Sequence, residues 1–216
     1  MLPDKLILAF DTSAAHCVAG LLLGDRVLVQ KAEVMAVGQA DRLVAMLEEV
    51  LAEAGVVWSG LAAIGVGIGP GNFTGVRISV AAARGLALAL DIPAIGVRVL
   101  EALAFGSAGD VLVTLDGRLG RLYAQSFREG AAIDAARLCD FSDLEAAGAT
   151  CFGFENAMVA KLTGGKAGSD RTLPDPISIA RIARGRMGTK YPSPAPFYLR
   201  APDAAPSTQP IITITP

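Results

Sequence analysis

The segment with the most evident capacity for chemistry is a glycine-rich turn. It runs from Gly69 to Gly75 and reads Gly-Pro-Gly-Asn-Phe-Thr-Gly. Glycines permit positive φ angles and close backbone approach, and backbone amides at the start of a helix attract anions. The turn therefore has two interpretations. It either contacts a phosphate or a partner, or it connects a strand tightly to a closely packed helix.

Two established phosphate-binding patterns are excluded at this turn. A Walker loop needs a lysine directly after its last glycine, and here Val76 follows Gly75. The dinucleotide fingerprint, started from Gly67 and Gly69, would need a third glycine where Asn72 stands. Any phosphate contact at the turn would therefore have to follow another pattern.

Two aspartates, each directly after an apolar run, are further candidates for nucleotide chemistry. Each could hold a metal–nucleotide, although an aspartate at a strand end more often caps a turn through its own backbone. Both interpretations stay open. With their neighbours in the two turns, the candidate nucleotide-proximal residues are Asp11, Ser13, Gly69, Gly71 and Asp116.

The other polar residues form no recognisable catalytic group. His16 is the only histidine, and no Ser–His–Asp set or histidine–metal cluster can be built around it. A lone histidine is more often a hydrogen-bonded structural residue. Arg77 and Arg84 lie seven residues apart, which places them on one helix face as a solvated stripe or a site for acidic groups.

Apolar patterns predict an α/β fold that positions these residues. Buried runs bounded by turn residues predict strands at 6–10, 17–23, 27–30, 61–67, 94–97, 111–115 and 122–127. Recurrence at three- and four-residue spacing predicts a helix at 41–54, and further helices are expected at 76–90, after the glycine-rich turn, and at 177–187, which is basic.

The order strand, aspartate-containing turn, strand occurs twice and predicts a duplicated fold. Mixed sheets flanked by helices then follow, as in the actin, heat-shock chaperone and sugar-kinase group. We expect an N-terminal subdomain at 1–100, which docks a partner, and a C-terminal subdomain at 101–190. A proline-rich tail at 191–216, extended or disordered, completes the chain.

The helix at 76–90 carries more apolar surface than one buried face requires, and the helix at 41–54 carries an apolar stripe. The helix at 76–90 is also dense in alanine and glycine, which lets another helix approach closely. These features indicate either an interface between chains or ordinary core helices. The candidate interface residues are Leu43, Met46, Leu47, Val50, Val76, Val80 and Ala83.

Composition narrows the class of protein. The net charge of -2 and the pI near 5.4 argue against an autonomous nucleic-acid binder, which would carry a basic face. Three cysteines without C-x-x-C spacing suit a reducing compartment. No signal peptide and no membrane-spanning run is apparent, so a soluble, cytoplasmic protein is expected.

Three motifs resemble the TsaB (YeaZ) family. They are ILAFDTS at 7–13, GIGPGNFTGVR at 67–77, and Gly85-Leu86-Ala87 ahead of Ile92-Pro93. The middle motif, G-P-G-x-F-T-G-x-R, is specific. The likeness covers residues 1–130 well, and 198–200 beyond them.

The resemblance implies an actin-like fold and a role in making N6-threonylcarbamoyladenosine in tRNAs that read codons beginning with A. In that family's pathway the paralogue TsaD transfers the threonylcarbamoyl group, TsaB pairs with TsaD, and the ATPase TsaE joins them. The chain would then be a non-catalytic subunit that binds and activates TsaD. It would contact tRNA only through the complex, and whether the isolated chain forms a homodimer is left open. No cofactor is implied, and ATP binding would be weak or supplied by the complex.

Comparison with the paralogue family indicates which chemistry is missing. Where TsaD proteins carry H-x-E-G-H, this chain reads Val-Leu-Glu-Ala-Leu, so Val99 and Leu103 occupy the ligand positions. Aliphatic side chains cannot ligate a metal, and we expect neither a metal nor catalysis by the isolated chain. The alternative is an active small-molecule kinase or nucleotidase using Asp11 and Asp116. The family's R-G-H-S-E segment is also altered, with Gln39 in place of its histidine.

Overall fold

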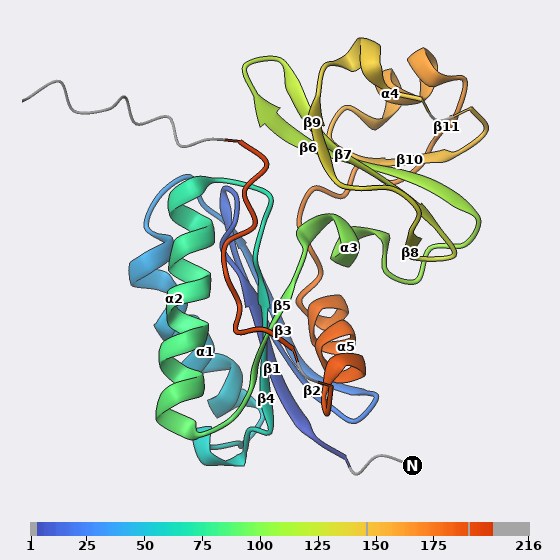
Figure 1. Ribbon diagram of the computed structural model, residues 1–216. Coiled ribbons are helices and arrows are strands. Elements are labelled where there is room, and N and C mark those ends of the chain that lie inside the picture. The colour runs from blue at the N-terminus through green and yellow to red at the C-terminus, as the bar shows by residue number, and fades with distance from the viewer. Residues whose placement is uncertain (1–3, 146, 190, 201–216) are drawn as a thin grey trace, which may run out of the picture.

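Two lobes, each a mixed sheet with packed helices, make up the computed structural model (Figure 1), which describes residues 4–145, 147–189 and 191–200. The N-terminal sheet has the order β3-β2-β1-β4-β5. In it, β1 pairs antiparallel with β2 and parallel with β4, and β4 pairs parallel with β5. Its strands are β1 (Leu6–Asp11), β2 (His16–Leu23), β3 (Arg26–Val34), β4 (Ala63–Gly67) and β5 (Ala94–Val97).

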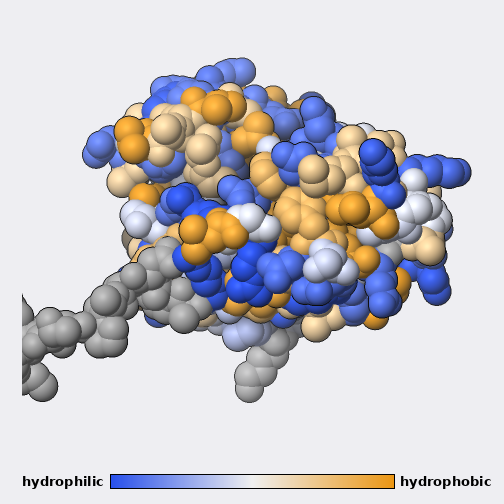
Figure 2. Space-filling view, turned by 90° about the horizontal axis from the view of Figure 1, so that it is seen from above, coloured by the Kyte–Doolittle hydropathy of each residue, from blue (hydrophilic) through white to orange (hydrophobic). Residues whose placement is uncertain are grey.

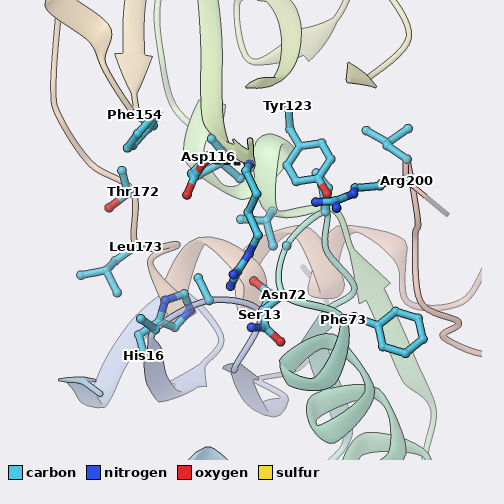
Figure 3. Close-up of a pocket in the computed structure, with 18 of the residues that line it drawn as sticks. Ser13, His16, Asn72, Phe73, Asp116, Tyr123, Phe154, Thr172, Leu173 and Arg200 are labelled. Carbon is cyan, nitrogen blue, oxygen red and sulfur yellow. Dashed lines mark hydrogen bonds between the residues drawn. The ribbon is translucent and has the colours of Figure 1, made fainter. Parts of the chain in front are cut away.

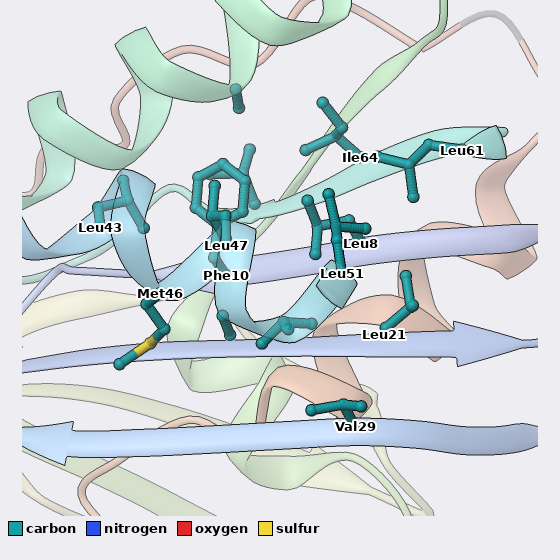
Figure 4. Close-up of a cluster of buried hydrophobic side chains, with 14 of the residues drawn as sticks. Leu8, Phe10, Leu21, Val29, Leu43, Met46, Leu47, Leu51, Leu61 and Ile64 are labelled. Atoms are coloured by element: carbon teal, nitrogen blue, oxygen red, sulfur yellow. The ribbon is translucent and has the colours of Figure 1, made fainter. Parts of the chain in front are cut away.

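Helices cover both faces of this sheet, because successive strand residues point to opposite sides. Leu8 and Phe10 face α1 (Gln39–Glu53) and α2 (Phe73–Leu90) in one core cluster, shown in Figure 4. Ile7 and Ala9 face α5 (Pro176–Arg186) in a second cluster. A strand buried on both faces must be apolar throughout, which explains the unbroken run at 6–10.

The C-terminal sheet repeats the same pairing and confirms the predicted duplicated fold. Its order is β8-β7-β6-β10-β11, with β6 antiparallel to β7 and parallel to β10, and β10 parallel to β11. Helices α3 (Val99–Ala104) and α4 (Asn156–Thr163) pack on it. Its strands are β6 (Asp110–Arg118), β7 (Arg121–Arg128), β8 (Ala131–Ala132), β9 (Arg137–Cys139, on β7), β10 (Thr150–Gly153) and β11 (Lys166–Ala167).

The predicted strands and helices are all present within a few residues of their expected bounds. The elements missed from sequence are α3, α4 and the short strands β8 to β11, together with the 3-10 turns at Trp58–Gly60 and Phe141–Asp143. Short elements carry too few periodic residues to show a pattern.

The expected subdomain boundaries are wrong at the C-terminal end. Helix α5 lies inside the range 101–190 but packs on the N-terminal sheet, where Ile177, Ile179 and Ala183 join the core cluster of β1. Residues 191–200 also return to this lobe, since the Phe197 amide donates to the Ile68 carbonyl at 2.8 Å. The rest of the expected tail, 201–216, lies outside the described residues.

The three cysteines are buried free thiols, and this predicts low reactivity. Burial raises the pKa of Cys17 to about 11 and also raises those of Cys139 and Cys151. Only the thiolate attacks a disulfide reagent, so at pH 8 we expect the native chain to react with Ellman's reagent far more slowly than the urea-unfolded chain. A rapid native reaction of one thiol per chain would contradict this arrangement.

Candidate functional site

The glycine-rich turn packs directly on the turn that follows β1. Thr12 Oγ1 donates to the Gly75 carbonyl at 2.7 Å, and the Asn72 amide donates to the Ser13 carbonyl at 2.5 Å. A Cβ at Gly71 would lie 2.2 Å from that same Ser13 oxygen. These glycines therefore serve close packing of two loops, a contact that neither interpretation of the sequence named.

Asn72 also caps the helix that the turn leads into. Its side-chain oxygen accepts from the backbone amides of Thr74 at 3.0 Å and Gly75 at 3.2 Å. These are two of the first-turn N–H groups that have no partner within the helix. The start of α2 thus has internal partners for part of the donor set that an anion would otherwise use.

Asp11 anchors a buried network rather than facing an open site. Its Oδ1 accepts from the Ser13 amide at 2.9 Å, the Ser13 hydroxyl at 2.7 Å and His16 Nε2 at 2.6 Å. The residue is fully buried, its Oδ2 has no partner among the described residues, and this oxygen packs against Gly67. Asp11 therefore positions Ser13 and His16, and the expectation that it lies beside a nucleotide is corrected.

A cavity of about 600 Å³ lies between the two lobes (Figure 3). Three of the five candidate nucleotide-proximal residues line it, namely Ser13, Gly71 and Asp116, while Gly69 and Asp11 do not. Asp116 is exposed, and its Oδ1 accepts from the Arg118 amide at 2.8 Å. The two predicted aspartates are thus not equivalent, because only the C-terminal one reaches the cavity.

The segment after α5 supplies one wall of this cavity, which sequence reasoning missed. Phe197, Tyr198, Leu199 and Arg200 all line it. Tyr198 stacks on Phe73 with ring centroids 5.1 Å apart, and its hydroxyl accepts from Arg77 Nε at 2.9 Å. Arg77 therefore makes a hydrogen bond within the chain, to Tyr198. The signals in the sequence were the two adjacent aromatic residues in a proline-rich stretch and the family likeness at 198–200.

The seven candidate interface residues lie inside the chain, which overturns their assignment to a partner. Each has at most 3% of its surface exposed, and all those on α1 join the core cluster in Figure 4. A helix lying on a sheet buries its apolar stripe against that sheet, so the stripe found from sequence marks the internal face. The residues whose assignment to the interface is overturned are Leu43, Met46, Leu47, Val50, Val76, Val80 and Ala83.

The outward face of α2 is nevertheless apolar and made of small residues. Ala81, Gly85 and Ala89 are exposed at four-residue spacing, and Leu88 is 87% exposed. No atom outside the helix lies within 4 Å of a Cβ built at Gly85. By length and composition alone α2 could cross a membrane, contrary to our expectation, although core helices of soluble proteins pass the same test.

Apolar side chains also reach the surface elsewhere. On α1, Val44 is 52% exposed, and on α4, Met158 and Leu162 are about half exposed. Figure 2, which views the molecule from above, shows apolar side chains gathered near the centre of this face among hydrophilic ones. The outward face of α2 differs from these because its small side chains leave the helix backbone accessible.

The two positions that correspond to metal ligands in the paralogue contribute to the core. Val99 and Leu103 lie on α3, are each 2% exposed, and pack against the C-terminal sheet. Within residues 4–145, 147–189 and 191–200, no group of three or more His, Cys, Asp or Glu side chains could hold a metal ion.

Four matches to known proteins show what the chain is similar to. The family model TsaD, described as tRNA N6-adenosine threonylcarbamoyltransferase, matches residues 32–163. TsaB of Escherichia coli is 35% identical over 122 residues, which cover 54% of this chain and 52% of TsaB. The structure of YeaZ from Pseudomonas aeruginosa superposes with a TM-score of 0.76 and 29% identity, covering 90% of this chain and all of YeaZ. An uncharacterized Mycobacterium leprae protein, ML0378, is 31% identical, and the chain spans 61% of its length.

Proposed function

Because the chain belongs to the TsaB (YeaZ) family, relatives of the threonylcarbamoyltransferase TsaD, we propose that it is a subunit for the synthesis of N6-threonylcarbamoyladenosine in tRNA. The tRNAs concerned read codons that begin with A. In this proposal the chain binds TsaD and activates it in the cytoplasm, TsaE joins the pair, and tRNA is met through the complex.

A non-catalytic role is supported by what occupies the positions where chemistry would be expected. Val99 and Leu103 offer no lone pair to a metal. Asp11, which a kinase of this fold would use, is buried and hydrogen-bonded to Ser13 and His16. A phosphoryl-transfer site needs its carboxylate free to hold a metal. The kinase or nucleotidase alternative therefore has less support than the accessory role.

The outward face of α2 is the feature that carries the docking proposal. Ala81, Gly85 and Ala89 would let a partner helix come close to the α2 backbone, and Leu88 offers apolar area at the end of this row. Helices that pack closely exclude water from such a surface, and burial of apolar area stabilises the contact.

A charge placed on this face should separate the chain from TsaD without unfolding it. We expect Ala81→Glu and Leu88→Glu to weaken TsaD binding about a hundredfold, since a central interface position is worth ~2–4 kcal/mol. Both side chains are solvent-exposed in the free chain, so its melting temperature should stay near the wild-type value. Calorimetric titration against purified TsaD and circular-dichroism melting measure the two quantities.

Leu162→Glu provides the matched control. Leu162 is an exposed leucine on a helix of the other lobe, at 58% exposure, and its charge should leave TsaD affinity unchanged. Wild-type affinity in both α2 variants would show that α2 is not the docking face. Equal loss in all three variants would show that added charge, and not the position, weakens binding.

A further inference from the structure

The cavity between the lobes is lined by a cationic side chain that has no polar partner among the described residues. Arg118 lines it, and within the described part of the chain its guanidinium has no hydrogen bond or ion pair. The backbone of Arg118 is held at φ +61°, in the left-handed region, while its amide donates to Asp116 Oδ1. A non-glycine residue adopts this conformation at a cost. A fixed backbone and a free guanidinium make Arg118 a suitable partner for an anionic group.

His16 presents a second unused polar atom to the same cavity. Only 2% of the residue is exposed, and Nε2 is bound to the buried Asp11 carboxylate at 2.6 Å. A carboxylate accepts only, so Nε2 carries the hydrogen of this bond, and in the neutral ring the other nitrogen, Nδ1, offers a lone pair. Nδ1 has no partner among the described residues. In Figure 3 the ring points into the space bounded by Leu173, Thr172 and Asn72.

The remaining walls of the cavity are largely apolar or aromatic. A volume of about 600 Å³ lies within the ~300–1,000 Å³ typical of small-molecule sites, which combine apolar walls with a few polar groups. Nδ1 of His16, which has no hydrogen-bond partner among the described residues, is one such polar group. The apolar side chains lining the cavity include Val99, Leu115, Phe154, Leu173 and Phe197.

We propose that this cavity binds a small organic carboxylate with an apolar body and a hydrogen-bond donor such as a hydroxyl group. Arg118 pairs with the carboxylate, Nδ1 of His16 accepts from the donor, and the apolar walls hold the body. A metal-bound nucleoside triphosphate fits less well, because Asp11, whose carboxylate would hold its metal, is fully buried and does not line the cavity. This assignment is independent of the docking role proposed above.

The test titrates the whole chain, without partners, with three matched probes. These are 3-phenyllactate, 3-phenylpropionate, which lacks the hydroxyl, and 3-phenyllactamide, which lacks the charge. Isothermal calorimetry should show phenyllactate binding about tenfold more tightly than each analogue, the factor that one good polar contact provides. ATP with magnesium, as a fourth probe, should bind more weakly than phenyllactate.

One variant tests the contribution of the Arg118 side chain, and a second controls for the loss of a positive charge. Arg118→Gln should abolish the preference for phenyllactate over its amide while keeping the preference over phenylpropionate. Arg181→Gln removes the same charge from an exposed position on α5 outside the cavity and should leave the affinity for each probe unchanged. Equal affinity for all three probes, binding unaffected by Arg118→Gln, tighter binding of ATP, or no binding of phenyllactate at millimolar concentration would each overturn the proposal.

Discussion

Leu47→Glu should leave no stably folded chain, because position 47 lies in the largest core cluster. The leucine is fully buried and packs with Leu8, Phe10 and their neighbours between α1 and the N-terminal sheet (Figure 4). Truncating a buried leucine costs about 2–5 kcal/mol, and burying an unpaired charge costs several more. The sum approaches the whole stability of a typical domain, ~5–15 kcal/mol. Circular-dichroism melting should show no cooperative transition.

Val44→Glu is the matched control on the same helix. Val44 lies three residues earlier, is 52% exposed, and its substitution should change the free energy of unfolding by less than about 0.5 kcal/mol. Soluble, cooperatively melting Leu47→Glu protein would mean that α1 presents its other face to the sheet. The comparison therefore tests the correction made to the interface residues as well as the fold.

Gly75→Ala should destabilise the chain, although it adds a single methyl group. A Cβ at this position would lie 2.0 Å from the Thr12 carbonyl oxygen, and backbone atoms cannot rotate away as a side chain can. The two loops are also joined there by the Thr12 hydroxyl, which donates to the Gly75 carbonyl at 2.7 Å. Overpacking costs about 1–3 kcal/mol, and we expect the upper end. Urea denaturation measures the loss.

Gly85→Ala, in the same helix, should stabilise the chain where Gly75→Ala destabilises it. No atom outside the helix lies within 4 Å of a Cβ at Gly85, so alanine adds helix propensity without a clash and should stabilise by about 0.5–1 kcal/mol. If Gly75→Ala and Gly85→Ala unfold at the same urea concentration, the close approach of Gly75 to Thr12 is absent in solution.

The sequence by itself determined the architecture of this protein. The apolar run at 6–10 has no polar side, which requires packing on both faces, and α5 on one side with α1 and α2 on the other provide it. The repeated strand–aspartate–strand pattern predicted the second sheet, whose pairing matches the first. In the turn at 69–75 only the positive φ of Gly69 is a local requirement for glycine, because Gly71 and Gly75 are needed where Ser13 and Thr12 of another loop approach them.

Only the tertiary structure decided which surfaces and side chains are available for function. A helical apolar stripe shows that one face is buried, but not whether a sheet or a partner buries it, and here the sheet takes Leu47 and Val80. His16 and the unpaired Arg118 likewise meet one cavity only because the two lobes and residues 191–200 converge. Such contacts join residues far apart in the chain, and hydrophobic periodicity carries no information about which distant groups will be neighbours.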